Sequence, residues 1–270
     1  MHIVTVATKN EGYFDYLVES CKRNGGELEV LGWGQEWKGF SHRISLMKDY
    51  LKRLADDDIV CFVDGYDVII LEPLSKVEKI FKDSGKRIIF ARDIDSSTIP
   101  LLITFLHMYF GKCKNLSINA GTYIGYVKDL KELYNQVYNK YDLKKYKDDQ
   151  IILTDICNTN NNVDIDINRQ MFLVTNHIDS NKKKIKIENQ RLRFDKYYPC
   201  ILHAPSNFDL TPILQQLGYN ITKAKKRATI DYVLKSTIMP YVLKIIAIFV
   251  IVSISYYIFR LAKIRHKNNK

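Results

Sequence analysis

The chain carries the stretch Ile59-Val60-Cys61-Phe62-Val63-Asp64-Gly65-Tyr66-Asp67-Val68-Ile69-Ile70, in which an apolar run ends in two carboxylates three residues apart. The run predicts a buried strand, with Asp64 and Asp67 at its carboxyl end. Open α/β sheets bind their ligands at that edge. Paired carboxylates there suit a hard divalent cation such as Mg²⁺ or Mn²⁺, which can clamp phosphate oxygens. An acidic turn without a metal is the alternative, because Asp and Gly are ordinary turn residues.

Strands alternate with helices on both sides of this stretch. The pattern predicts an α/β body with a largely parallel sheet and helices on both of its faces. With 270 residues, 46% of them hydrophobic, the chain can bury one sizeable core. The predicted strands are residues 2–7, 28–31, 59–63, 87–91, 119–126 and 201–203, and the predicted helices are residues 13–24, 42–55, 74–83, 130–141 and 147–157.

The formal net charge of +11 arises at the C-terminal end of the chain. Residues 222–270 hold 11 of the 41 Lys and Arg but one of the 30 Asp and Glu, which leaves 30 basic and 29 acidic residues before them. A nearly neutral body argues against a nucleic-acid partner. We therefore expect one domain over residues 1–220, a basic linker over 221–236, a transmembrane helix over 237–262 and a basic tail over 263–270.

The predicted transmembrane helix contains an uncharged run, IIAIFVIVSISYYIF at residues 245–259. Extended back to Thr237, the segment can cross a hydrocarbon core of about 30 Å at about 1.5 Å per residue. A buried helix of a soluble domain is the alternative. Because residues 2–7 resemble a strand and not a signal peptide, a single-pass C-terminal anchor would leave the body in the cytosol. Basic residues on both sides of the segment leave its orientation open.

Five cysteines are scattered along the chain, with no C-x-x-C pair. Their odd number and irregular spacing predict buried thiols and not a disulfide or zinc framework. The abundance of Lys, Asn and Ile suggests an AT-rich genome, of a kind found in several organisms and in large DNA viruses.

Six segments resemble, in order, the glycosyltransferase domain of the procollagen lysyl hydroxylases and related nucleotide-sugar transferases of the GT-A type. They are TVATK at 5–9, LGWGQEW at 31–37, DGYDV at 64–68, INAGTYIGY at 118–126, DDQ at 148–150 and ILH at 201–203. In the family the corresponding segments read T-V-A-T-K, L-G-x-G-x-x-W, D-S-Y-D-V, N-S-G-G-F-I-G-F/Y, D-D-Q and L-I-H-G-N-G. The resemblance runs from residue 1 to about residue 220 and implies a GT-A-like, Rossmann-like fold.

The resemblance implies a metal site and a nucleotide site. Asp64, Asp67 and His203 would hold a Mn²⁺ that bridges the diphosphate of a UDP-sugar, since Mn²⁺ accepts oxygen and imidazole ligands. The metal would neutralise charge on the departing UDP. The residues that would line the nucleotide and sugar pocket are Thr8, Lys9, Arg43, Tyr66, which would flank the uracil, and Gly121.

The resemblance also assigns catalytic roles to Asn119, Asp148 and Asp149. Asn119 would shape the floor under the sugar, and the two aspartates would bind sugar hydroxyls or orient the acceptor hydroxyl. Each position has a structural alternative. His203 could be a core histidine, and Asp148-Asp149 could be a helix N-cap cluster, where acids complement the dipole. Trp33 and Trp37 could be core aromatics, and we expect His42, His107 and His177 to be structural.

The chain departs from the family in four places. Residues 92–102 lack the family's C-W-P signature, Ala120 replaces a serine, and Ala204-Pro205-Ser206-Asn207 follows His203 in place of G-N-G-P. No hydroxylase domain follows the resembling region, where we expect the membrane helix. These differences affect the expected acceptor and diphosphate contacts more than the metal ligands.

Together these features predict a membrane-anchored glycosyltransferase that depends on Mn²⁺. By resemblance, its donor would be UDP-glucose or UDP-galactose and its acceptor a hydroxylysine or galactosyl-hydroxylysine of a collagen-like protein. Transfer to another protein or glycan is one alternative. A catalytically inactive, membrane-tethered module that binds nucleotide sugars is the other.

Overall fold

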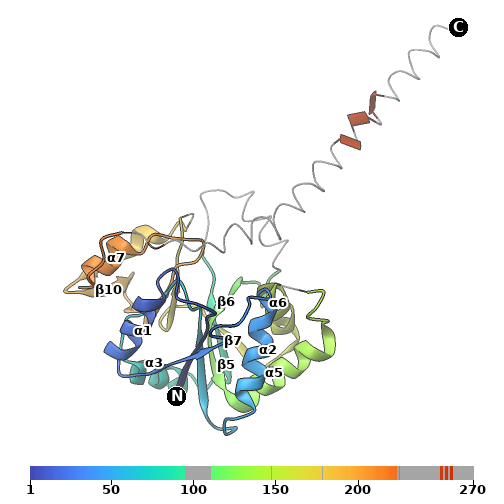
Figure 1. Ribbon diagram of the computed structural model, residues 1–270, viewed down its shortest axis with the longest axis horizontal. Coiled ribbons are helices and arrows are strands. Elements are labelled where there is room, and N and C mark those ends of the chain that lie inside the picture. Colours follow the sequence, from blue (N-terminus) through green and yellow to red (C-terminus); the bar gives the residue numbers. More distant parts are fainter. Residues whose placement is uncertain are drawn as a thin grey trace, which may run out of the picture. The chain divides into compact units, whose positions relative to one another are not determined.

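The computed structural model describes residues 1–94, 111–146, 148–177, 179–223 and 225, and six residues between 250 and 257. The chain forms two compact units, Met1–Lys226 and Arg227–Lys270. The first unit contains a six-stranded sheet in the order β2-β1-β3-β6-β5-β7 (Figure 1). Its strands are β1 (His2–Val6), β2 (Leu28–Leu31), β3 (Ile59–Val63), β5 (Ile88–Arg92), β6 (Ile118–Tyr126) and β7 (Val163–Asp166).

Most neighbours in this sheet run parallel, as predicted. β1 pairs in parallel with β2 and β3, and β5 pairs in parallel with β7. β6 is antiparallel to its neighbours β3 and β5, so its start lies at the carboxyl edge of both. The backbone N–H of Asp64 donates to the carbonyl oxygen of Gly121 at 2.8 Å. The antiparallel strand thus brings Asn119 and Gly121 to the edge where Asp64 ends β3.

Helices cover both faces of the sheet, and the alternation of side chains along β3 divides the core between them. Val60 and Phe62 pack in a cluster with residues of α2 (Ser41–Leu51), α5 (Val127–Lys140) and α6 (Asp149–Thr159). Ile59, Cys61 and Val63 face the other way, toward α1 (Phe14–Arg23) and α3 (Leu74–Asp83). Figure 1 shows these two helical layers on opposite sides of the sheet. The fully buried strand explains why its sequence is continuously apolar.

A second, smaller sheet lies beside the main one, with the order β4-β11-β8. Residues 201–203, the last of these strands along the chain, were predicted, but no strand was predicted between residues 158 and 200. A separate hairpin and a short helix pack on this sheet. Their apolar side chains form a cluster with those of the sheet, which we call the third apolar cluster and which includes Ile69, Leu173, Leu192, Leu202 and Leu214. These elements are β4 (Val68–Ile70), β8 (Phe172–Val174), η1 (Lys182–Lys184), β9 (Ile185–Glu188), β10 (Arg191–Phe194), β11 (Ile201–His203) and α7 (Thr211–Gln216).

The expectation that all five cysteines are free thiols is wrong for one pair. Cys113, just before β6, and Cys157 of α6 form a disulfide, with their Cα atoms 5.5 Å apart. Cys21, Cys61 and Cys200 are buried free thiols, as predicted. The pair was missed because 44 positions separate its members, and spacing in the sequence does not show which segments meet.

The second unit is described at only six positions, all of them helical and exposed: Val250, Ile251, Ser253, Ile254, Tyr256 and Tyr257. The rest of the predicted transmembrane helix, residues 237–262, lies outside the described residues. Within the described part of the chain, no helix has both the length and the apolar character needed to cross a membrane.

Candidate metal and nucleotide-sugar site

The two predicted metal carboxylates flank the turn between β3 and β4, and strand pairing brings the histidine to them. Asp64 follows the last residue of β3, and Asp67 precedes the first residue of β4. His203, the last residue of β11, lies opposite Val68 in the antiparallel β11–β4 pair. The N–H of Ala204 donates to the carbonyl oxygen of Asp67 at 2.8 Å, which fixes this register. Residues about 140 positions apart therefore meet because of one three-residue strand pair.

The three side chains form a group that fits a divalent metal. His203 Nε2 lies 3.2 Å from Asp67 Oδ1 and 3.5 Å from Asp64 Oδ2. One ligand atom from each side chain can be chosen so that all three lie within 4.8 Å of one another. Neighbouring ligands of an octahedral ion at about 2.1–2.3 Å would be about 3.0–3.3 Å apart. His203 and Asp67 are buried, and two carboxylates with one imidazole suit Mn²⁺ chemically.

Asn119 sets the orientation of the histidine ring. Its Oδ1 atom accepts a hydrogen bond from the N–H of Gly121 at 3.0 Å, and it lies 2.9 Å from His203 Nδ1. An amide oxygen only accepts, so Nδ1 carries the proton and donates to it. This leaves Nε2 facing the two carboxylates. A hydrogen bond of this kind on the far ring nitrogen is the usual support for a metal-binding histidine.

The electrostatics of the group favour a positive charge at its centre. Burial alone would lower the pKa of His203, but Asp67 and Asp64 outweigh burial and raise it. Without a metal, a proton on Nε2 would therefore supply the positive charge between the carboxylates. A metal ion must replace that proton, so the site couples metal binding to proton release.

Gly121 leaves the space that the metal ligands occupy. A Cβ atom on this residue would lie 2.6 Å from Asp64 Oδ2, 3.1 Å from Asn119 Oδ1, and closer still to Cε1 of His203. Any larger side chain would push the ligands apart. The site therefore needs glycine here for space and not for an unusual backbone conformation.

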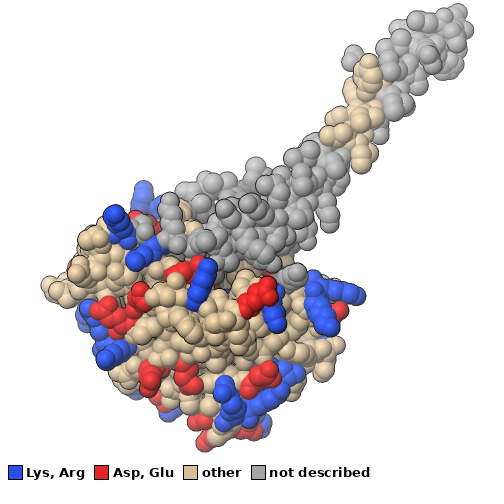
Figure 2. Space-filling view, viewed as in Figure 1, with Lys and Arg blue, Asp and Glu red and all other residues tan. Residues whose placement is uncertain are grey.

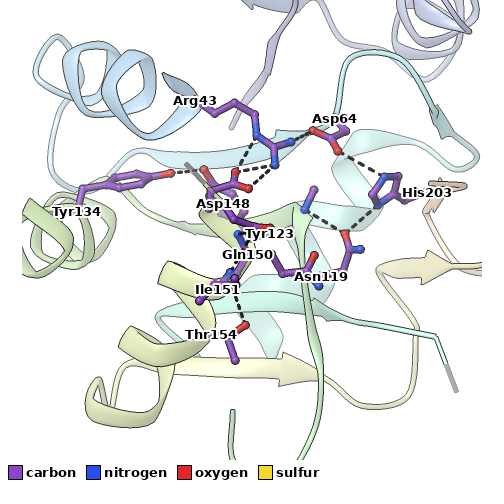
Figure 3. A network of polar contacts seen from close by, with 12 residues as sticks. Arg43, Asp64, Asn119, Tyr123, Tyr134, Asp148, Gln150, Ile151, Thr154 and His203 are labelled. Atoms are coloured by element: carbon purple, nitrogen blue, oxygen red, sulfur yellow. Dashed lines mark hydrogen bonds and ion pairs between the residues drawn. The ribbon is translucent and has the colours of Figure 1, made fainter. Parts of the chain in front are cut away.

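Arg43 of α2 links Asp64, one of the metal carboxylates, to Asp149, one of the predicted catalytic aspartates. Figure 3 shows the guanidinium of Arg43 pointing toward Asp64. Its Nε and Nη2 atoms donate to Asp149 Oδ2 and Oδ1, both at 2.7 Å, and Nη1 donates to Asp64 Oδ1. The other oxygen of Asp64 faces His203. Burial tends to lower the pKa of Arg43, but Asp149 and Asp64 raise it. The resemblance placed Arg43 near the nucleotide, which stays a prediction; in the structure its guanidinium binds these two carboxylates.

Asp148 and Asp149 have different environments although they are adjacent. Asp148 is the N-cap of α6, where Oδ1 accepts from the N–H groups of Gln150 and Ile151 at 3.0 and 3.3 Å. The structural alternative for this residue is therefore present in the fold. Asp149 is buried, and burial raises its pKa to about 6 against the opposing effect of Arg43. The buried Arg43 pair keeps Asp149 ionised at neutral pH.

The predicted nucleotide pocket begins at the end of β1. The N–H of Thr8 donates to the hydroxyl of Tyr66 at 2.9 Å, and Lys9 pairs with Glu11. Tyr66 is 6% exposed and packs against Phe14, and we call this pair of rings the aromatic wall. These residues adjoin the turn that carries the metal carboxylates.

Two residues that the sequence analysis did not assign to the site contribute to it. Trp33 is 52% exposed and its ring centre lies 5.0 Å from that of Phe14, so it extends the aromatic wall into solvent. Asp93 directly follows β5 and its carboxylate accepts from Asn119 Nδ2 at 3.4 Å. Burial raises the pKa of Asp93, against the opposing hydrogen bonds. Its position after a predicted strand was the same signal that singled out Asp64.

A family described as the PLOD GT domain matches residues 1–229. Among curated proteins, human procollagen-lysine,2-oxoglutarate 5-dioxygenase 2 is 28% identical over 165 residues, which cover 57% of this chain and 21% of that protein. The multifunctional procollagen lysine hydroxylase and glycosyltransferase of Caenorhabditis elegans is 29% identical, covering 56% and 22%. Procollagen-lysine,2-oxoglutarate 5-dioxygenase 1 of Gallus gallus is 27% identical, covering 80% and 31%. The matched regions thus span only about a fifth to a third of these relatives.

Solved structures of glycosyltransferases are more distant. The galactosyltransferase LgtC, solved with donor and acceptor sugar analogs, has a TM-score of 0.47 at 16% identity, covering 83% of this chain and 98% of that one. Mouse xyloside xylosyltransferase 1 has a TM-score of 0.46 at 12% identity, covering 77% and 98%.

Proposed function

Because the chain belongs to the family of PLOD glycosyltransferase domains and is a glycosyltransferase by that membership, we propose that it transfers glucose or galactose from a UDP-sugar. The proposed acceptor is a hydroxylysine-linked site of a collagen-like protein, and the proposed metal is Mn²⁺. The observation that carries the proposal is the grouping of Asp64, Asp67 and His203 around one point, with the ring of His203 oriented by Asn119.

The residues of the site supply the parts that this reaction needs. Asp64, Asp67 and His203 would hold the metal, which when bound neutralises charge on the departing diphosphate. Arg43 holds Asp64 so that one oxygen faces His203, and it holds Asp149 with both oxygens engaged. The proposed task of Asp149 is to bind donor or acceptor hydroxyls beside the metal.

The aromatic wall supports a nucleotide at the same edge of the sheet. Trp33 and Tyr66 flank Phe14, and Thr8 and Lys9 follow β1 beside Tyr66. Base faces stack favourably on aromatic side chains. We place the uracil against this wall and the diphosphate at the metal.

We also propose that the C-terminal segment anchors the protein in a membrane. The support is the uncharged sequence at residues 245–259 and the exposed apolar side chains at five described positions, with exposed fractions of 50–67%. These five residues span more than one helical turn, and Ser253 is the sixth described residue of this helix.

UDP release by the full chain tests the proposed reaction. The full chain in mild detergent is incubated with a panel of UDP-sugars, with and without Mn²⁺. We expect Mn²⁺-dependent release with one preferred sugar, and its loss in Asp67→Ala and His203→Ala. The matched controls are Asp56→Ala, an exposed aspartate paired with Lys131, and His177→Ala, an exposed histidine. Both should release UDP as the parent does.

The same assay separates the alternatives. Release that rises only with a non-collagen acceptor would assign another protein or glycan as substrate. A folded chain that binds UDP-sugar in a calorimeter but releases no UDP with any acceptor would be an inactive binding module.

A further inference from the structure

The hairpin of β9 and β10 has one apolar face and one basic face. Along β9, Ile185 and Ile187 face the third apolar cluster, while Lys186 between them is exposed. Side chains of a strand alternate between its two faces, so the outer face of this hairpin projects into solvent. The exposed lysines on and beside the hairpin are Lys182, Lys183, Lys184, Lys186 and Lys196.

These lysines lack the acidic partners that many other lysines of the body have. Lys52, Lys79 and Lys131, for example, each form an ion pair at 2.7 Å with an aspartate. Within the described residues, none of the five hairpin lysines forms a salt bridge. The two acids of the hairpin are Glu188, which pairs with Arg193, and Asp195, whose side chain is exposed. The hairpin therefore carries a local excess of positive charge on a body that is nearly neutral.

The basic surface continues into the segment where the chain leaves the body. A Cβ atom on Gly218 would lie 3.0 Å from Oε1 of Gln190, which is in the turn of the hairpin. Leu217 and Ile221 share the third apolar cluster with the hairpin. Figure 1 draws β10 beside α7, and Figure 2 shows basic side chains at this end of the body, as it does at other places on this face. Lys223 and Lys225, both exposed, follow within a few residues.

We propose that the hairpin lysines together with Lys223 and Lys225 form a surface that docks on an anionic lipid bilayer. Exposed lysines without acidic partners suit a dense layer of anionic headgroups, which attracts basic segments over about a Debye length. A bilayer is favoured over a soluble polyanion because the same basic chain continues into the uncharged segment at residues 245–259. The choice of a bilayer rests on the proposed membrane anchor and does not depend on the transferase reaction.

Docking would also orient the candidate site. Lys182 Nζ donates to the carbonyl oxygen of His177 at 2.7 Å, and the N–H of Thr175 donates to the carbonyl oxygen of His203 at 3.0 Å. The loop from Thr175 to Lys182 thus links the basic surface to the metal-binding edge. A body docked through the hairpin would act on acceptors presented close to the membrane.

Lysine reactivity measures the docking directly. The full chain is placed with lipid nanodiscs of phosphatidylcholine alone or with about 30% phosphatidylserine, and acetylation rates are read by mass spectrometry. We expect Lys183, Lys184 and Lys186 to react at least threefold more slowly with the anionic discs. The difference should vanish in about 1 M salt, where the Debye length is about 3 Å. Lys52 and Lys79, exposed on other elements, are the internal controls.

Charge reversal provides the second arm. In Lys183→Glu/Lys186→Glu we expect Lys184 to lose its protection, whereas Lys52→Glu/Lys79→Glu should leave it protected. All four positions are exposed, and thermal unfolding checks that both variants remain folded. Equal acetylation rates in the two lipids would overturn the proposal. The proposal would also be overturned if soluble polyphosphate slowed the acetylation of the hairpin lysines while the anionic discs did not.

Discussion

Replacing Gly121 by alanine tests the geometry of the metal site with the smallest possible change. The added Cβ would lie 2.6 Å from Asp64 Oδ2, and ordinary contacts begin at 3.4 Å, so this oxygen must withdraw by about 0.8 Å. The ring of His203 must move further. Metal sites tolerate deviations of only about 0.2 Å in their ligand distances. At least one ligand is therefore lost.

We expect the loss of metal affinity in Gly121→Ala to be larger than the loss that follows when hydrogen bonds around the ligands are disturbed. Such disturbances cost about 10–100-fold, so we expect Gly121→Ala to weaken Mn²⁺ binding by about 100-fold or more. This corresponds to at least about 2.7 kcal/mol. The assay is calorimetric titration of Mn²⁺ into the full chain, with thermal unfolding to confirm that the variant is folded.

Gly125→Ala is the matched control. It lies on the same strand, and its Cβ would meet Ile88 Cγ1 and Leu130 Cγ at 3.1 Å, away from the metal ligands. Overpacking of this kind destabilises by about 1–3 kcal/mol and should leave Mn²⁺ affinity unchanged. If folded Gly121→Ala binds Mn²⁺ as tightly as the parent, the three residues do not form the metal site.

Three further outcomes follow from the buried charges and the disulfide. Arg43→Met should lower the free energy of unfolding by about 3–5 kcal/mol, because it leaves Asp149 buried without its partner. Burial raises the pKa of Asp149 to about 6 even against the opposing effect of Arg43, so in the variant this pKa should lie higher still. Denaturant unfolding should therefore show the variant regaining stability as the pH falls through that higher value and the carboxyl protonates. Mn²⁺ affinity should fall up to about tenfold for each pH unit below the pKa of His203, because the metal must replace a proton there. The neighbouring carboxylates raise this pKa, and titrations of Mn²⁺ from pH 8 to pH 5 would measure the fall. Three of the five cysteines should react with a thiol reagent in denaturant without reductant, and Cys157→Ser should lower the free energy of unfolding by about 4 kcal/mol, the loop-closure value for its separation from Cys113. Five reactive thiols in protein taken from cells would show that the pair is reduced there. An oxidised pair is typical of secretory compartments and would argue against a cytosolic body.

Local patterns in the sequence were enough to predict five of the six strands of the main sheet and the helices that cover it. The continuous apolar run of β3 and the carboxylates after it are local features, and so is the N-cap at Asp148. Helix α1 was predicted to within one residue at each end, because its apolar residues recur at helical spacing. Such features depend on residues within one or two turns of each other.

Features that depend on long-range pairing could not be predicted from residues alone. The strands β7 to β10 have three or four residues each, too few to show a period. The pair of Arg43 and Asp149 joins positions 106 apart, and the pattern of helices does not show which of them lie side by side. His203 reached the candidate site only through the resemblance, since its place beside Asp67 depends on the register of β11 and β4.

The central claim is that Asp64, Asp67 and His203 hold the metal that binds the diphosphate of the donor. The most direct measurement is a crystal structure of the full chain grown with Mn²⁺ and UDP, with the metal located by its anomalous scattering. The account predicts one strong peak within about 2.0–2.4 Å of an oxygen of each aspartate and of Nε2 of His203, in contact with the diphosphate. UDP bound at the end of β1 with no metal at these three residues, or with the metal at another site, would contradict it.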